Sequence, residues 1–248
     1  MELYKKEDKE IIFQTQNRDP FFNYLTEIIV SFIDKKKGRV LDLGCGAGRN
    51  VLAAARLGLE VVGVDANQKS LEIARDFVGQ MRLSGRTKFV KANITKLRPK
   101  QFGMFDYVIL QEVIEHVEDY QSLIDFAYSS LKKGGKILIT TPNDPKQWNL
   151  LDDYAEHVRR FKLNEVEKAL KEFKKIKIFT IGFPFHRMVI TLYNQLLKLR
   201  KRHHEAKSFR KNKIFHGFYY LVGTIFLRLD DLFRFTPWGT TIVAIGEK

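Results

Sequence analysis

The chain has few of the residues that mark secreted or membrane-spanning proteins. Its 248 residues contain one cysteine, Cys45, which excludes an internal disulfide and is typical of a reducing compartment. The N-terminal residues, MELYKKEDKE, lack the apolar stretch of a signal peptide. Residues 214–227 carry no charge, but these 14 residues are fewer than the roughly 20 that cross a bilayer. We therefore expect a cytoplasmic protein, with peripheral membrane contact left open.

Acidic residues are also scarce. The chain has 43 Lys and Arg against 29 Asp and Glu, a net charge of +14. Residues 183–235 contain eleven lysines and arginines against three acids, which gives +8. A basic segment rich in aromatic residues fits an anionic partner, either a nucleic acid or a lipid surface. The alternative is a helical cover whose charges are solvated and whose aromatic side chains pack inward.

Apolar, β-branched runs alternate with helical stretches from residue 38 onward. This alternation predicts an α/β fold with a doubly wound, mostly parallel, seven-stranded sheet and a helical insertion before the last strand. We expect an N-terminal helical cap (1–37), a core (38–182), a basic aromatic insertion of two or three helices (183–238) and a closing strand (239–248). Strands are expected at 39–44, 60–65, 87–92, 105–110, 136–141, 175–181 and 240–246, and helices near 49–58, 68–83, 119–132 and 163–173.

The segment VLDLGCGAGRN is the strongest local signal. A strand runs directly into Gly44, Gly46 and Gly48, and a helix follows, so the backbone can turn sharply and approach a ligand closely. The spacing matches neither the dinucleotide fingerprint nor a Walker loop. Asp42 precedes the glycines, and Asp65 ends the next strand, where a carboxylate can accept hydrogen bonds from ribose hydroxyls.

Residues 38–182, together with the final PWGTTIVAIGEK, resemble the class I S-adenosylmethionine-dependent methyltransferases. The resemblance implies that the three glycines line the methionine part of S-adenosylmethionine and that Asp65 holds its ribose. Ala66 would lie beside the adenine and Ile94 would pack on the ring. Asn93 stands where the family often has an Asp, and its side-chain oxygen can accept the adenine amino group. Gln111 would lie near the sulfonium.

The segments FDYVILQEVIEHVED and GGKILITTPN resemble the ubiquinone-pathway O-methyltransferases and related small-molecule enzymes. Glu112, Glu115 and His116 are spaced i, i+3 and i+4, so one helical turn would gather them on one face beside the transferred methyl group. In one interpretation this turn only opens a helix, and His116 packs under the cofactor. In a second, His116 is a general base for the acceptor.

A third interpretation is a divalent metal site. The small-RNA 3′-terminal 2′-O-methyltransferases are similar in pairing an ExxEH turn with a later histidine. Here His157, in HVRRF, would join Glu112, Glu115 and His116 as ligands for Mg²⁺, Mn²⁺ or Zn²⁺. An ion there would lower the pKa of an acceptor hydroxyl and orient it.

The acceptor is expected to lie under the N-terminal cap and the insertion. Apolar and aromatic stretches beside basic residues favour a lipophilic acceptor, or an interfacial membrane element. A soluble metabolite, RNA bound on aromatic platforms, and a cofactor-binding module without turnover are the alternatives. The oligomeric state has no signature in this sequence.

Overall fold

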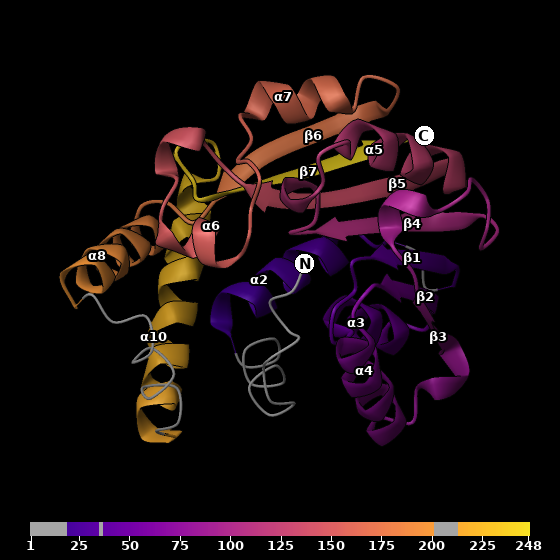
Figure 1. The fold of residues 1–248 in the computed structure, drawn as a ribbon, viewed down its shortest axis with the longest axis horizontal. Coiled ribbons are helices and arrows are strands. Elements are labelled where there is room, and N and C mark those ends of the chain that lie inside the picture. The colour runs from indigo at the N-terminus through magenta and orange to yellow at the C-terminus, as the bar shows by residue number, and fades with distance from the viewer. Residues whose placement is uncertain (1–18, 35–36, 201–212) are drawn as a thin grey trace.

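The computed structural model describes residues 19–34, 37–200 and 213–248, which form one sheet with helices on both faces (Figure 1). The seven strands follow the order β3-β2-β1-β4-β5-β7-β6, and β7 alone runs antiparallel to its neighbours. The strands are β1 (Arg39–Leu43), β2 (Glu60–Asp65), β3 (Thr87–Lys91), β4 (Phe105–Gln111), β5 (Leu131–Pro142), β6 (Lys174–Ile181) and β7 (Thr241–Glu247). The predicted fold class is confirmed.

Two apolar layers hold the helices on the sheet, because alternate strand residues point to opposite faces. Val40 packs with α2, α3 and α4, whereas Leu41 packs with α5 and α7 on the other side. The main helices are α2 (Pro20–Ser31), α3 (Arg49–Arg56), α4 (Gln68–Gln80), α5 (Tyr120–Ser130), α6 (Leu150–Tyr154), α7 (Leu163–Ala169), α8 (Phe185–Arg200) and α10 (Lys213–Asp230). Short 3-10 turns lie at Ser84–Arg86, Ile94–Lys96, Ile114–His116, Pro145–Gln147 and Asp231–Phe233.

The order of the strands reverses between β1 and β4. The chain passes from β1 outward to β2 and β3, and then returns to the other side of β1 to form β4. In open parallel sheets, ligands bind at the carboxyl ends of the strands beside such a reversal. The residues that follow β1, β2 and β4 therefore surround the expected site.

Several predicted helix ends differ from the structure. The helices expected at 68–83, 119–132 and 163–173 end earlier, at Gln80, Ser130 and Ala169. The last of these predictions ran through Phe173, whose ring is buried against the sheet, although its residue lies outside the helix. Periodicity could not separate a buried loop residue from a helical one, and it gave no indication of the five-residue helix α6.

The insertion contains helices α8 and α10 among its described residues, and α10 packs against both α2 and α8 (Figure 1). Asp230, at the end of α10, accepts hydrogen bonds from the backbone N–H groups of Phe185 and His186, 2.8 and 2.9 Å away. The predicted charged connector at 198–213 and the first 18 residues of the predicted cap fall largely outside the described residues. No helix in the described part of the chain is both long and apolar enough to cross a membrane.

Candidate active site

The glycine loop between β1 and α3 requires glycine at two positions for steric reasons. Gly44 and Gly48 have φ values of +73° and +82°, which side chains rarely adopt. A Cβ atom on Gly44 would lie 2.7 Å from a methyl of Val113, and one on Gly48 would lie 2.8 Å from Cβ of Ala74. The loop therefore packs tightly between the turn after β4 and helix α4.

Asp65 connects this loop to the end of β2. One of its carboxylate oxygens accepts the N–H of Gly46 at 2.9 Å, and the other accepts the N–H of Asn67 at 2.7 Å. Burial raises the pKa of Asp65, although these hydrogen bonds act in the opposite direction. The carboxylate thus lies between the two backbone segments that were predicted to contact the methionine and adenine ends of the cofactor.

Asp42 begins a buried polar chain under the glycine loop. Desolvation raises the pKa of its carboxyl to about 7, against a hydrogen bond with Asn50 that lowers it. The hydroxyl of Thr26 on α2 lies 3.1 Å from Oδ1 of Asn50 and 3.4 Å from Oε1 of Gln111. This series of polar contacts joins α2, α3 and the ends of β1 and β4, and it fixes the position of the Gln111 side chain.

The residues predicted to surround the adenine follow β2 and β3. Ala66 and Asn93 are exposed, and Ile94 is half-buried beside them. The amide oxygen of Asn93 accepts hydrogen bonds from the N–H and hydroxyl of Thr95, at 3.0 and 2.9 Å. Its predicted bond to an adenine amino group would therefore share or replace these local contacts.

The EVIEH segment is not one helical turn, and this prediction was wrong. Glu112 has a φ of +52°, and only Ile114–His116 form a 3-10 turn. The cause is the end of β4, where the N–H of Glu112 still donates to the carbonyl of Thr140 in the neighbouring strand, at 3.0 Å. Glu112 therefore belongs to the strand end, and its spacing from Glu115 is not that of a helix face.

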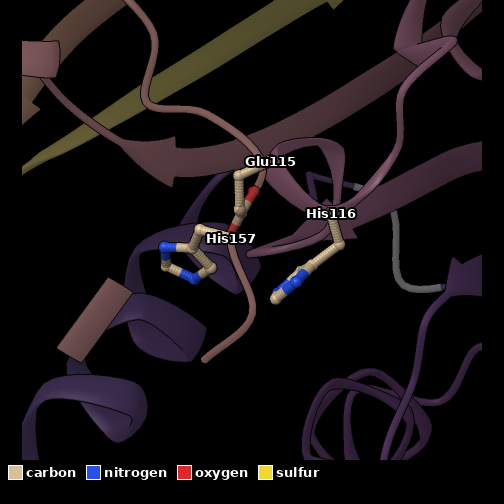
Figure 2. A group of neighbouring side chains, drawn as sticks. All are labelled: Glu115, His116 and His157. Atoms are coloured by element: carbon tan, nitrogen blue, oxygen red, sulfur yellow. The ribbon is translucent and has the colours of Figure 1, made fainter. Parts of the chain in front are cut away.

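Three of the four predicted metal ligands nevertheless come together. Glu115, His116 and His157 offer ligand atoms that lie within 4.8 Å of one another, and Figure 2 shows the three side chains converging. Glu112 lies outside this group. The imidazole rings of His116 and His157 meet edge to face, with centroids 4.8 Å apart. The N–H of Val158 donates to the carbonyl of Glu115 at 2.9 Å, which fastens the two loops together.

Buried carboxylates dominate the electrostatics of this group. Glu115 is fully buried, and burial together with the neighbouring Glu112 raises its pKa well above the usual value. One oxygen of Glu115 accepts the hydroxyl of Thr141 at 3.0 Å. Its other oxygen, and one of Glu112, are buried without a hydrogen-bond partner among the described residues. Unsatisfied carboxylate oxygens at such depth are costly unless they hold a proton or a cation.

His116 lies beside them in its neutral form. Burial, and then the neighbouring His157, lower its pKa to about 4. Neutral imidazoles and carboxylates are the ligands that Zn²⁺ and Mn²⁺ accept, so the donor set fits a divalent cation. The ligand atoms of a tetrahedral Zn²⁺ site are about 3.4 Å apart, so this group, whose atoms lie within 4.8 Å of one another, would have to contract around an ion.

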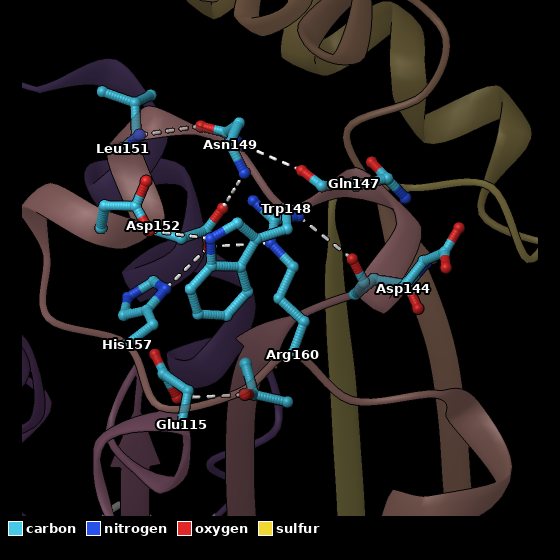
Figure 3. Close-up of polar contacts among 12 residues, drawn as sticks. Glu115, Asp144, Gln147, Trp148, Asn149, Leu151, Asp152, His157 and Arg160 are labelled. Atoms are coloured by element: carbon cyan, nitrogen blue, oxygen red, sulfur yellow. Dashed lines mark hydrogen bonds and ion pairs between the residues drawn. The ribbon is translucent and has the colours of Figure 1, made fainter.

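Two further residues of the site were missed in the sequence. Asp152 is 1% exposed, and its Oδ1 lies 2.8 Å from Nδ1 of His157 and 2.8 Å from Nε of Arg160 (Figure 3). Burial by itself would raise the pKa of Asp152, but the hydrogen bonds from His157 and Arg160 keep it below the ordinary value. The sequence did contain a signal, an acid five residues before His157 in DDYAEHVRRF, but this spacing alone does not show that the two side chains are in contact.

Comparison with known proteins places this site in a family. The model of the methyltransferase-domain family matches residues 14–173. The chain belongs to that family. A ubiquinone biosynthesis O-methyltransferase from Bartonella quintana is 34% identical over 170 residues, which cover 67% of this chain and 62% of that protein. A ubiquinone biosynthesis O-methyltransferase from Idiomarina loihiensis is 36% identical over 121 residues, which cover 48% of this chain and 49% of that protein.

Solved structures share the fold across nearly the whole of this chain. Haemonchus contortus phosphoethanolamine N-methyltransferase 2, in complex with S-adenosyl-L-methionine, has a TM-score of 0.59 at 19% identity, covering 98% of this chain and 60% of that one. The [4+2]-cyclase SpnF has a TM-score of 0.63 at 18% identity, covering 98% and 85%. The predicted resemblance to class I methyltransferases is confirmed, while the chain spans only about half to three fifths of the curated relatives it matches.

Proposed function

We propose that this protein transfers the methyl group of S-adenosylmethionine to a hydroxyl of a small, lipophilic acceptor. The observation that carries the proposal is the position of two sets of residues at one reversal of the sheet. The glycine loop follows β1 and Asp65 ends β2, and the Glu115, His116 and His157 group follows β4 and α6. The first set suits a nucleoside with a charged tail, and the second suits an acceptor hydroxyl.

S-adenosylmethionine supplies a methyl group on a positively charged sulfur, which any well-aligned nucleophile can attack. Under this proposal Gly44, Gly46 and Gly48 admit the methionine tail, because their lack of Cβ leaves the backbone open to close approach. Asp65 accepts the ribose hydroxyls, and Gln111 faces the reacting end. Much of the rate would then come from aligning the acceptor with the methyl group.

The Glu115, His116 and His157 group would orient the acceptor hydroxyl. Because the pKa of His116 is about 4, this imidazole is a weak base at neutral pH. That favours the third interpretation of the sequence, a site for Mg²⁺, Mn²⁺ or Zn²⁺, but with Glu115, His116 and His157 as ligands and without the predicted fourth ligand Glu112, which lies outside this group. A divalent ion there would lower the pKa of the acceptor hydroxyl, so that its deprotonation would not depend on a strong base.

The lipophilic acceptor is proposed from the helices beside the site. We propose that α2, α8 and α10 cover the acceptor, as the cap and the insertion of the predicted domain plan. Apolar side chains on α8 and α10 remain exposed, among them Met188 at 49%, Leu192 at 51% and Leu221 at 60%. Such faces suit an apolar molecule or the membrane surface from which it would be drawn.

The deciding experiment follows a methyl label. The purified protein is incubated with methyl-labelled S-adenosylmethionine and a lysate of its source, and the lipid, RNA, protein and metabolite fractions are separated. We expect the label in the organic phase. Label in RNA would mean that the acceptor is a 2′-hydroxyl rather than a lipophilic molecule. Tight cofactor binding without any methyl transfer would indicate a binding module. This second outcome has to be tested because a protein named a [4+2]-cyclase shares the fold.

The metal part has its own test. We expect EDTA to abolish turnover and Mn²⁺ to restore it, and we expect a Glu115→Ala enzyme to ignore added metal. Turnover that continues unchanged in EDTA would remove the ion and return His116 to a hydrogen-bonding role.

A further inference from the structure

We infer that Asp152 is a positioning residue, which fixes the tautomer of His157 and thereby turns its Nε2 lone pair toward the Glu115 and His116 side chains. The inference rests on the proposed function only for what that lone pair contacts. The hydrogen bonds around Asp152 that carry it join Asn149, His157 and Arg160 (Figure 3).

The first step concerns what Asp152 can do to an imidazole. Its Oδ1 receives two groups, Nδ1 of His157 and Nε of Arg160, each at 2.8 Å. Its Oδ2 accepts the N–H of Asn149 at 2.8 Å. An arginine at this distance keeps a carboxylate charged, and a charged carboxylate only accepts hydrogen bonds. Nδ1 of His157 must therefore carry the hydrogen, which leaves the lone pair on Nε2.

The second step extends this tautomer to the neighbouring imidazole. Nδ1 of His116 faces the backbone carbonyl oxygen of Glu156 at 3.4 Å. A carbonyl oxygen cannot donate, so the compatible tautomer again has its hydrogen on Nδ1. Both rings then offer Nε2 as an acceptor. Imidazole ligands of metals are commonly oriented in this way by an acceptor on their second nitrogen.

The third step shows that Asp152 is held rigidly. Nη1 of Arg160 donates to the carbonyl of Asn143 at 3.1 Å, just past the end of β5. The side-chain amide of Asn143 donates in turn to the carbonyl of Gly239 at 2.7 Å, before β7. Asp152 is thus tied to two central strands, although it lies on the short helix α6 between β5 and β6. A rigid support of this kind is what a precise imidazole orientation requires.

The sequence also offers a matched control. Asn149 and Asp152 form the reciprocal cap of α6, in which the side chain of Asn149 accepts the N–H of Leu151 at 2.9 Å. Asn149→Ala removes the other half of this cap, yet the side chain of Asn149 makes no described contact with His157. It separates an effect on the imidazole from a general loss of order in the loop.

The experiment uses the full chain without cofactor, substrate or metal. Two-bond ¹H–¹⁵N spectra of the imidazoles report which nitrogen carries the hydrogen, and His157→Gln identifies the signals of His157. We expect the Nδ1–H form of His157 in the wild type and in Asn149→Ala, and a mixture with the Nε2–H form in Asp152→Asn. Asp152→Glu is expected to restore the Nδ1–H form in part.

Titration with Mn²⁺ gives the second readout. We expect affinity to fall about 10- to 100-fold in Asp152→Asn and to change little in Asn149→Ala. An Nε2–H form of His157 in the wild type, or the same tautomer in wild type and Asp152→Asn, would overturn the inference. If Mn²⁺ fails to bind the wild type while the tautomers behave as expected, the metal is excluded and the positioning role stands.

Discussion

Asp65 is the residue on which cofactor affinity should depend most. Its carboxylate accepts two backbone N–H groups and occupies the end of β2, where it would also accept the ribose. Hydrogen bonds to charged groups are worth about 1.5–3 kcal/mol, and each 1.4 kcal/mol is tenfold in affinity. We predict that Asp65→Ala weakens S-adenosylmethionine binding about 10- to 100-fold, measured by calorimetry.

The control for this prediction is Asp76→Ala, which removes an exposed carboxylate from α4. It changes the net charge by the same amount and leaves the loop intact. Equal loss of affinity in both variants would mean that overall charge, rather than the ribose contact, governs binding.

Asp42 should make stability depend on pH. Its pKa is raised to about 7 by burial, so between its unfolded value of 3.8 and 7 the folded state holds a proton that the unfolded state has released. The stability that Asp42 contributes is therefore fully present below pH 3.8 and is lost as pH rises through 7. We predict that Asp42→Asn reduces the fall in unfolding free energy between pH 5 and pH 8, measured by urea titration.

Other buried groups also titrate in that range, so the comparison is between variants at each pH. His116 and His186 contribute in the opposite direction, because the pKa of each imidazole is lowered to about 4. The stability that they give the folded protein is therefore lost as pH falls. A pH dependence in Asp42→Asn as steep as that of the wild type would show that Asp42 titrates normally.

At the scale of elements, the two helices of the insertion are joined by hydrogen bonds from the start of α8 to Asp230 at the end of α10. Asp230 at the end of α10 caps the first turn of α8, and the ring of His186 stacks on Phe21 of α2 at 4.2 Å. The contacts of Asp230 and His186, which we call the lock, therefore join α2 to α8 and α10, more than 150 residues later in the sequence. These contacts also hold the helices of the proposed acceptor cover together.

We predict that Asp230→Ala lowers the free energy of unfolding by about 1–2 kcal/mol, since removing a helix cap costs about this much. Chemical denaturation would measure it, with Asp76→Ala as the reference for a carboxylate that caps nothing. Because the lock lies outside the glycine loop, cofactor affinity should stay within about twofold, and a large loss would mean that α8 reaches the cofactor.

At the scale of the whole molecule, one face of α10 is exposed and apolar. Leu221, Ile225 and Leu229 are 60%, 48% and 41% exposed, at a spacing that places them along one side of the helix, and Leu232, 70% exposed, follows in the 3-10 turn Asp231–Phe233. The chain as a whole carries +14. An apolar stripe on a strongly basic protein is suited to the surface of an anionic membrane.

We predict co-sedimentation with phosphatidylcholine vesicles that contain phosphatidylglycerol, and weaker binding to vesicles of phosphatidylcholine alone. Replacing Leu221, Ile225 and Leu229 by Ser should weaken binding about tenfold or more, because each leucine-sized side chain buried is worth about 1.5–3 kcal/mol. Leu57→Ser and Met81→Ser, each 44% exposed elsewhere, are the matched controls. A triple variant that binds like the wild type, or one that only changes the oligomeric state, would contradict the membrane contact.

Local sequence determined the cofactor half of this protein. The apolar, β-branched runs and the helical stretches between them predict a doubly wound sheet, because burial on both faces leaves few other arrangements. The glycines at 44 and 48 and the acid at 65 were readable because backbone conformation and strand ends are set within a few residues. The resemblance to methyltransferases that pair an ExxEH turn with a later histidine named Glu115, His116 and His157 as candidates.

Tertiary structure decided how these candidates are arranged. Glu112 left the expected helical turn because β4 pairs with β5 as far as Thr140, a contact across 28 residues. Asp152, His157 and Arg160 are close in sequence, but only the folded chain shows that Arg160 contacts both the Asp152 carboxylate and the carbonyl of Asn143 at the end of β5. Hydrogen bonds between distant segments depend on the packing of the whole sheet, so a local pattern could name the residues of this site but not their partners.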